Sequence, residues 1–477
     1  MTASIALFVV GLAMAVMVPW QLHYLFYDPQ RVAQWQLSGA FLLVTGLLLR
    51  RGVYAQLLVW WQGYRRIVTI AVAALIIAAL VFSPMPGVAL LEFSYLAMLL
   101  GLILVIAAAV PFLDNRGWRF LAAVCAVFIL FYSAHSIVYV SLIWDFGDLH
   151  DFSLGFDNVR FFADVAAGMM PLSLLYIVVR PRTSWLAAML LALPLSVWWW
   201  LLWVSESRAA LLGLVFGSVV VLVLFGRAAR LPVFTLALAG FCGLLGWWLL
   251  NPLVVEGAES PFLRDIASSS GRMALWSDAL RYAWQQFPLG LGPMGFAADG
   301  EYRSASAHNL LLNIAAEWGL PLALTLLGIL VRISWVIRKR VQHLSEKEKP
   351  LYTCLVLAFI SVMVNVQFAG AQIMPVSALV LVLVIGLAVG FRPGGALPQP
   401  STLDIRPVRA TLVWAILMLV FCYQVFAGAA LHRLSDAPVS QCVTDGTRLS
   451  YYPRFWVQGR VDCMKDIEPD HWLFQRL

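Results

Sequence analysis

The sequence predicts an all-α integral membrane protein. Of its 477 residues, 62% are hydrophobic and only 12% are charged, and the mean hydropathy is +0.85. Apolar runs of about 18 or more residues recur along the chain, and a helix of that length crosses the hydrocarbon core of a bilayer. This composition excludes a soluble enzyme, and we expect about thirteen transmembrane helices, with twelve to fourteen as the range.

The first expected span, residues 4–20, lacks the basic region and the small-residue cleavage site of a signal peptide. The other spans are expected near residues 33–49, 66–83, 88–111, 119–140, 161–179, 185–203, 209–225, 232–249, 309–332, 351–370, 373–391 and 410–428. The chain shows no repeat of fixed period. An odd number of spans places the two ends of the chain on opposite sides of the membrane.

The basic residues of the short loops give the orientation. Clusters fall in alternate loops, at Arg50/Arg51/Arg65/Arg66, Arg116/Arg119, Arg180/Arg182, Arg227/Arg230, Arg338/Lys339/Arg340 and Arg406/Arg409. Positive loops face the cytoplasm, so we expect a cytoplasmic N-terminus and a C-terminus on the outer side. The net charge of +7 is therefore interpreted as a topology signal, and no nucleic-acid partner is expected.

This orientation divides the chain into four parts. They are an N-terminal bundle at residues 1–249, an outer loop at 250–308, C-terminal helices at 309–428 and an outer tail at 429–477. The Pro- and Gly-rich stretch at 392–407 is expected to be a cytoplasmic linker.

Arginines on the outer side are exceptions to the charge pattern. They are Arg160, Arg208, Arg264, Arg272, Arg281 and Arg303. A guanidinium can bind two oxygens at once, which suits phosphate or carboxylate groups. The alternative is that these side chains reach lipid headgroups, or that Arg160 and Arg208 pair with Asp157 and Glu206.

The long outer loop contains a predicted interfacial helix in "SGRMALWSDALRYAWQQFP", residues 270–288. Its apolar side chains at helical spacing are Met273, Trp276, Leu280 and Trp284. The helix is expected to start at Ser270 or Gly271 and to stop before Pro288. Arg272 then lies in its first turn, beside free backbone N–H groups that suit an anion. The following "PLGLGPMGF" is interpreted as a structural turn rather than a phosphate-binding loop.

A polar stripe follows in "HNLLLNIAAEWG". His308 is expected at the outer mouth of the tenth span, and Asn309, Asn313 and Glu317 recur every four residues on one helix face. Such side chains usually face a bundle interior or a water-filled cavity. The alternative for His308 is a purely structural role.

These segments together resemble a known family. "SRAALLGL", "GRMALWSDAL", "FPLGLGPMGF" and "HNLLLNIAAEWG", within residues 205–320, resemble the O-antigen ligase and O-antigen polymerase superfamily. The resemblance implies a bacterial inner-membrane glycosyltransferase with a GT-C-like fold, a periplasmic active site and a glycan donor linked to undecaprenyl pyrophosphate. It further implies that Arg208 and Arg272 hold the pyrophosphate and that His308 takes part in catalysis. Arg160, another outer arginine, is expected to bind the pyrophosphate with them.

The acceptor is predicted from two further stretches. "GFDNVRFF" (155–162) and "YYPRFWVQGR" (451–460) resemble the pilin-type O-oligosaccharyltransferases, which glycosylate Ser or Thr of pilin or another protein. The alternatives are an O-antigen ligase that acts on lipid A-core, an O-antigen polymerase, and a non-enzymatic transporter of polyprenyl-linked sugars. A transporter would be expected to show repeats and charges near the membrane midplane.

The predicted chemistry needs no cofactor. The outer side carries no Asp-x-Asp motif or His/Cys ligand cluster, so no metal is expected, and arginines would neutralise the leaving group. Neighbouring arginines should lower the pKa of His308, which favours its action as a base, with Glu206 as the other candidate base.

A disulfide is expected in the outer tail. Cys442 and Cys463 lie in the oxidising outer segment, whereas Cys125, Cys242, Cys354 and Cys422 lie within expected spans. The alternative is a pair of free thiols.

Overall fold

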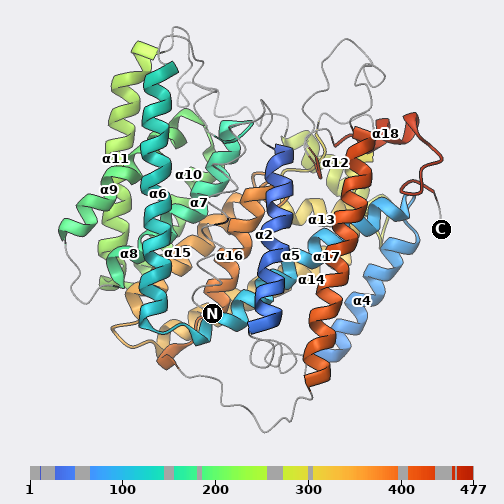
Figure 1. The fold of residues 1–477 in the computed structure, drawn as a ribbon, viewed down its shortest axis with the longest axis horizontal. Helices are drawn as coiled ribbons and strands as arrows, with labels where there is room; N and C mark the ends of the chain where they lie inside the picture. Colours follow the sequence, from blue (N-terminus) through green and yellow to red (C-terminus); the bar gives the residue numbers. More distant parts are fainter. Residues whose placement is uncertain are drawn as a thin grey trace.

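The computed structural model describes most of the chain as a bundle of helices (Figure 1). The described residues are Gly11, 27–48, 65–143, 155–179, 185–254, 272–298, 304–395, 407–435, 454–456 and 459–475, and they contain no strand. Apart from Gly11, the expected span 4–20 lies outside them, as do Arg264, Arg303 and Cys442.

The N-terminal helices follow the apolar runs of the sequence. They are α2 (Tyr27–Leu48), α4 (Arg65–Val81), α5 (Pro86–Ala109), α6 (Asn115–Ile143), α7 (Val159–Ser173), α8 (Leu175–Val178), α9 (Trp185–Val204), α10 (Arg208–Phe225) and α11 (Arg227–Val254). The later helices are α12 (Arg272–Gln285), α13 (Leu310–Trp318), α14 (Leu320–His343), α15 (Lys349–Asn365), α16 (Pro375–Gly390), α17 (Pro407–Ser435) and α18 (Val461–Ile467).

Many of these helices can cross a membrane. Within the described ranges, eight helical stretches are long and apolar enough, and three shorter apolar helices accompany them. The eight are Pro86–Phe112, Asn115–Ser141, Val159–Val178, Trp185–Val204, Arg208–Phe225, Arg227–Leu250, Leu320–His343 and Thr411–Leu434. The chain is therefore a multi-pass membrane protein, and the count of thirteen spans stays a prediction.

Burial separates inner helices from peripheral ones. α7 and α16 are buried along most of their length, whereas α14 and α17 expose large apolar side chains such as Leu324 and Leu419. α9 packs on α11, α10 on α15 and α5 on α16. Apolar side chains that point away from the bundle match a lipid environment, since acyl chains are as apolar as they are.

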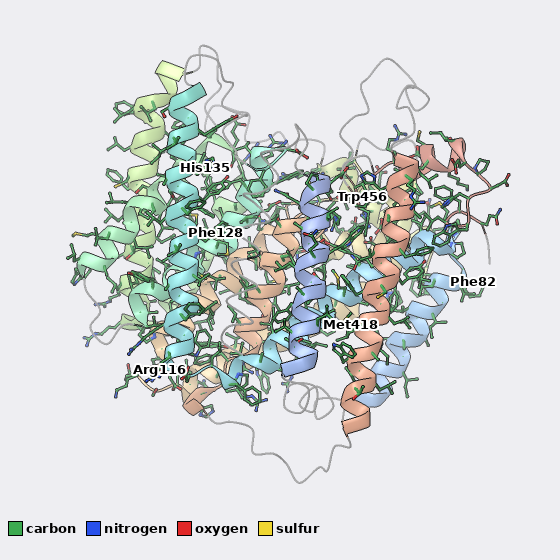
Figure 2. The ribbon with its side chains drawn as sticks, viewed as in Figure 1. Phe82, Arg116, Phe128, His135, Met418 and Trp456 are labelled. Carbon is green, nitrogen blue, oxygen red and sulfur yellow. The ribbon has the colours of Figure 1, made fainter. Side chains whose placement is uncertain are left out.

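The two ends of the bundle differ in the residues they carry. α12 and α18 lie at one end (Figure 1), whereas Arg116, from a predicted cytoplasmic loop, lies at the opposite end (Figure 2). We call the end with α12 the α12 end; the sequence predicts that it is the outer one.

One expected span is interrupted. Residues 309–332, predicted as one helix, form α13 and α14, because Gly319 breaks the helix with φ of +91°. A Cβ at Gly319 would collide with the carbonyl oxygen of Pro288, so glycine is needed for this close approach. The expected span 161–179 is present as one helical stretch, Val159–Val178, in which only Leu174 separates α7 from α8.

The predicted helix of the long outer loop is present as α12. Ala279 and Ala283 are buried in clusters with α13, whereas Met273, Leu280 and Trp284 are 62%, 53% and 75% exposed. A helix that buries its alanines and exposes its large apolar stripe is suited to lie at a membrane interface.

Candidate active site

Three arginines lie at the starts of three helices. Arg160 is in the first turn of α7, and Arg208 and Arg272 are the first residues of α10 and α12. Asn158 caps α7, because its side-chain oxygen accepts the backbone N–H of Arg160 at 2.9 Å. Helix N-termini carry free N–H groups and partial positive charge, so each arginine adds to a position that already favours an anion.

The three arginines lie close enough to act on one another. Burial lowers the pKa of Arg272 below its ordinary value, and the charges of Arg160 and Arg208 lower it further. A lowered pKa means that these surroundings disfavour the positive charge. A bound anion would relieve this cost, so the cluster Arg160/Arg208/Arg272, called here the arginine cluster, is a candidate anion site.

His308 lies beside this cluster, just before α13. Burial lowers its pKa from 6.5 to about 4, and the charges of Arg272 and Arg160 contribute, as expected from the sequence. Its Nε2 lies 3.0 Å from Ser304 Oγ, and its backbone has φ of +48°, an uncommon value for a residue other than glycine. His308 is therefore a neutral imidazole at neutral pH, beside a group of cations.

The loop that carries His308, residues 304–309, is held by its neighbours. At Ala307, the N–H donates to Asn313 Oδ1 at 3.1 Å, and the carbonyl accepts from Trp276 Nε1 at 3.0 Å. Asn309 caps α13 by accepting the N–H of Leu312, and its Nδ2 donates to the carbonyl of Gln367 at 2.9 Å. These bonds join the His308 loop to α12, α13 and the segment between α15 and α16.

The chain was compared with known proteins. Residues 167–327 match a protein-family model described as O-antigen ligase. These residues are therefore similar to O-antigen ligases and are called here the O-antigen ligase-like domain. This match supports the O-antigen ligase superfamily, a membrane glycosyl-transferring function and a lipid-linked glycan donor. A comparison with curated proteins gave no match.

The O-antigen ligase-like domain includes only part of the candidate site. Arg208, Arg272 and His308 lie within residues 167–327, whereas Arg160 precedes this range. Folding brings Arg160 to the other three through α7, whose C-terminal part belongs to the domain.

The predicted polar stripe is present on α13, but part of it forms hydrogen bonds and ion pairs with other segments of the chain. Asn313 Nδ2 donates to Glu317 Oε2 at 2.9 Å, and Glu317 Oε1 accepts the N–H of Phe296 at 3.2 Å. Glu317 also pairs with Arg454 of the tail at 2.6 Å and is fully buried. Of the two surroundings expected for the stripe, Glu317 thus faces the interior of the bundle, where it joins α13 to two other segments. The 288–296 stretch forms the expected turn, and Leu291 N–H donates to the carbonyl of Ala316.

Sequence reasoning missed a carboxylate beside the arginine cluster. Asp164 lies on α7, one helical turn after Arg160, is 6% exposed and interacts electrostatically with Arg272. Its Oδ1 accepts a 2.7 Å hydrogen bond from Asn365 Nδ2 at the end of α15. The spacing of four residues between Arg160 and Asp164 was visible in the sequence, whereas the contact with Asn365 was not.

Glu206, the other candidate base, has a backbone φ of +52° just before α10, and its carbonyl accepts the N–H of Arg208 at 3.0 Å. It therefore shapes the turn that presents Arg208. Within the described part of the chain, no three His, Cys, Asp or Glu side chains are placed to hold a metal ion.

In the tail, Cys463 is disulfide-bonded, while Cys125, Cys242, Cys354 and Cys422 are free. Cys442, the predicted partner of Cys463, lies outside the described residues.

Proposed function

We propose that this protein transfers a glycan en bloc from undecaprenyl pyrophosphate to a serine or threonine hydroxyl of pilin or another protein. The observation that carries the proposal is the convergence of Arg160, Arg208, Arg272 and His308 at the α12 end. Three guanidinium groups suit a pyrophosphate, and a neutral imidazole beside them suits removal of a hydroxyl proton. We place this site on the periplasmic face of a bacterial inner membrane, with the N-terminus in the cytoplasm and the C-terminus in the periplasm.

The reaction breaks one bond and forms another. The acceptor oxygen attacks the anomeric carbon of the first sugar, and the bond from this carbon to the pyrophosphate oxygen breaks. Negative charge grows on the leaving pyrophosphate, where the arginine cluster stabilises it. The acceptor proton passes to His308, so the arginines and the histidine act on opposite ends of the same displacement.

The two ring nitrogens of His308 have different surroundings. In the proposed mechanism Nε2–H donates to Ser304 Oγ, 3.0 Å away, which leaves the lone pair of Nδ1 for the acceptor proton. A Cβ at Gly370 would lie 3.4 Å from Nδ1, so glycine leaves this side of the ring uncrowded. Ser304 thereby selects the tautomer that the base role requires.

A second candidate acceptor is lipid A-core. The description of the matched family model, O-antigen ligase, favours it. The donor chemistry and the roles of the arginine cluster and His308 would be the same, and only the hydroxyl that enters the site would differ.

The test is a transfer assay with the full chain purified in detergent, where transport across a membrane cannot occur. The protein is incubated with an undecaprenyl-pyrophosphate glycan and either pilin or lipid A-core, and the products are identified by mass spectrometry. We expect glycosylated pilin and no transfer by a His308→Ala variant. Product on lipid A-core alone would show that lipid A-core, and not pilin, is the acceptor. Absence of product on both would contradict transfer to either acceptor.

A further inference from the structure

A short segment of the tail is inserted into the bundle. Arg454, Phe455 and Trp456 are only 1%, 2% and 2% exposed. Trp456 packs edge-on against Trp35 of α2 with ring centroids 5.3 Å apart, and its Nε1 donates to the carbonyl of Gly428 on α17 at 2.9 Å. Burial of a charged side chain costs free energy unless partners compensate the charge. The contacts of Arg454 therefore indicate what this residue does.

The guanidinium of Arg454 binds three separate segments. Its Nη2 pairs with Glu92 of α5 at 3.0 Å and with Glu317 of α13 at 2.6 Å. Its Nη1 donates to the carbonyl of Ala305 at 3.0 Å. The planar guanidinium thus binds two carboxylates and one carbonyl at once, a geometry that the ammonium group of a lysine cannot reproduce.

The third contact reaches the His308 loop. Ala305 lies three residues before His308, next to Ser304, whose hydroxyl meets the imidazole. Arg454 also contacts the loop indirectly, through Glu317. Glu317 accepts a hydrogen bond from Asn313, and Asn313 accepts the N–H of Ala307.

The backbone of Arg454 is also fixed. Its carbonyl accepts from Tyr27 Oη at 2.5 Å and from Arg31 Nη2 at 3.3 Å, both on α2. The guanidinium of Arg31 lies 4.9 Å from the ring centres of Tyr95 and Phe455 and donates to the carbonyl of Phe455 at 2.9 Å. Both the main chain and the side chain of Arg454 are therefore fixed by hydrogen bonds.

We propose that Arg454 is a positioning residue of the transferase site, and that through it the tail fixes the loop that presents His308. The inference rests on the proposed role of His308 as the base. Arg454 touches neither donor nor acceptor; it sets the place of the imidazole relative to the arginine cluster. A misplacement of about 1 Å can cost on the order of a hundredfold in rate, so a tail residue can control turnover without contact with substrate.

The experiment compares variants of the full chain in detergent by turnover, donor KM and amide hydrogen exchange of residues 304–310. For Arg454→Met we expect turnover to fall about tenfold to a hundredfold with donor KM within about twofold, because the arginine cluster is intact. Exchange in residues 304–310 should become faster. Arg454→Lys should recover part of the turnover, and Arg433→Met, which removes an exposed arginine of α17, should change none of the three readouts.

Arg454→Met leaves two carboxylates buried without their cation, which can unfold the protein. A triple variant, Arg454→Met with Glu92→Gln and Glu317→Gln, removes the three charges together and should restore thermal stability. Because the bond to Ala305 is still missing, we expect low turnover and fast exchange in this variant as well. A stable triple variant with the turnover and the loop exchange of the unmodified protein would overturn the proposal.

Failure of the base role can be told from failure of the positioning role. If His308→Ala keeps transfer activity, the proposed role of His308 as the base is wrong. The hydrogen exchange of residues 304–310 in the Arg454 variants then still tests the positioning role: faster exchange supports it, and unchanged or slower exchange contradicts it. If His308→Ala is inactive while the Arg454 variants match the unmodified protein in exchange and turnover, only the positioning role is wrong.

Discussion

Arg272 and Arg454 are two arginines in opposite electrostatic surroundings. Burial and the charges of Arg160 and Arg208 lower the pKa of Arg272. Burial also acts to lower the pKa of Arg454, but the carboxylates of Glu317 and Glu92 outweigh it, so that the pKa is raised. Two like charges act on Arg272 and are only partly offset by Asp164, whereas Arg454 is paired with opposite charge.

The difference separates a ligand site from a structural contact. Arg454 is paired within the fold with the carboxylates of Glu92 and Glu317, so this network joins the tail to α5 and α13. The arginine cluster brings three like charges to three helix N-termini, an arrangement that favours a bound anion. The grouping of these like charges is the reason that we propose the arginine cluster as the donor site, and the four predictions below test this distinction.

The largest effect is expected at His308. His308→Ala should lower transfer by about a hundredfold to ten-thousandfold, the range for loss of a general base, while donor binding stays nearly intact. Arg272→Ala should weaken both, because it removes part of the anion site. Donor binding is measured by titration with the lipid-linked glycan, and transfer by product formation under single-turnover conditions.

Loss of donor binding in the His308 variant would assign His308 a different role. If His308→Ala loses donor binding as severely as Arg272→Ala, the histidine belongs to the anion site. Glu206 or Asp164 would then be tested as the base by substitution with Gln and Asn.

The next effect concerns the shape of the cation at Arg272. Arg272→Lys keeps the charge but loses the planar fork that binds two phosphate oxygens, so we expect a loss of roughly 2 to 4 kcal/mol in transition-state stabilisation, or about thirtyfold to a thousandfold in kcat/KM. The measurement is kcat/KM for the donor at matched expression. Normal kcat/KM would show that Arg272 serves only as a lipid anchor.

The arginine cluster and most helices could be predicted from the sequence because each has a local signal. Apolar runs predict helices α5, α6 and α9 to within a few residues, since length and hydropathy alone decide membrane insertion. Arg208, Arg272 and His308 stand out because charged or titratable groups are rare and costly in such a chain.

The features that the sequence did not predict depend on distant partners. Arg454 and Glu92 are 362 residues apart, and Asp164 and Asn365 are 201 residues apart, so neither pair has a local pattern. The division between α13 and α14 has a local signal as well, because Gly319 is followed by Pro321 in the first turn of α14. What the sequence does not show is the close approach of Pro288, which requires glycine at position 319.

A smaller effect is expected at Asp164, the carboxylate that partly offsets the arginine cluster. Asp164→Asn keeps the size of the side chain and an oxygen that can accept from Asn365, but it removes one negative charge close to the bound phosphates. We expect the Kd of the donor to fall about threefold to tenfold, an effect that should shrink at high salt. Unchanged affinity with lost turnover would show instead that Asp164 takes part in the reaction.

The smallest effect is the response to mild acid, and its sign follows from the pKa of His308. The active form is the neutral imidazole, and the pKa of about 4 keeps it neutral down to mildly acidic pH. The value of kcat/KM should therefore rise with pH through one ionisation near 4 and stay level above it. At about pH 5 it should keep roughly nine tenths of its plateau, whereas a histidine with the ordinary pKa of 6.5 would keep only about 3%.

Two comparisons decide whether the arginine cluster sets this profile. Arg160→Met removes one of the cations that act on His308, so the midpoint of kcat/KM should move upward, toward 6.5. In the donor complex the negative pyrophosphate opposes the arginines, so the midpoint seen in kcat should lie above the midpoint seen in kcat/KM. If neither the Arg160 substitution nor the bound donor changes the midpoint of the pH profile, the ionising group does not lie beside the arginine cluster. The charge imbalance that separates Arg272 from Arg454 would then have no part in the chemistry.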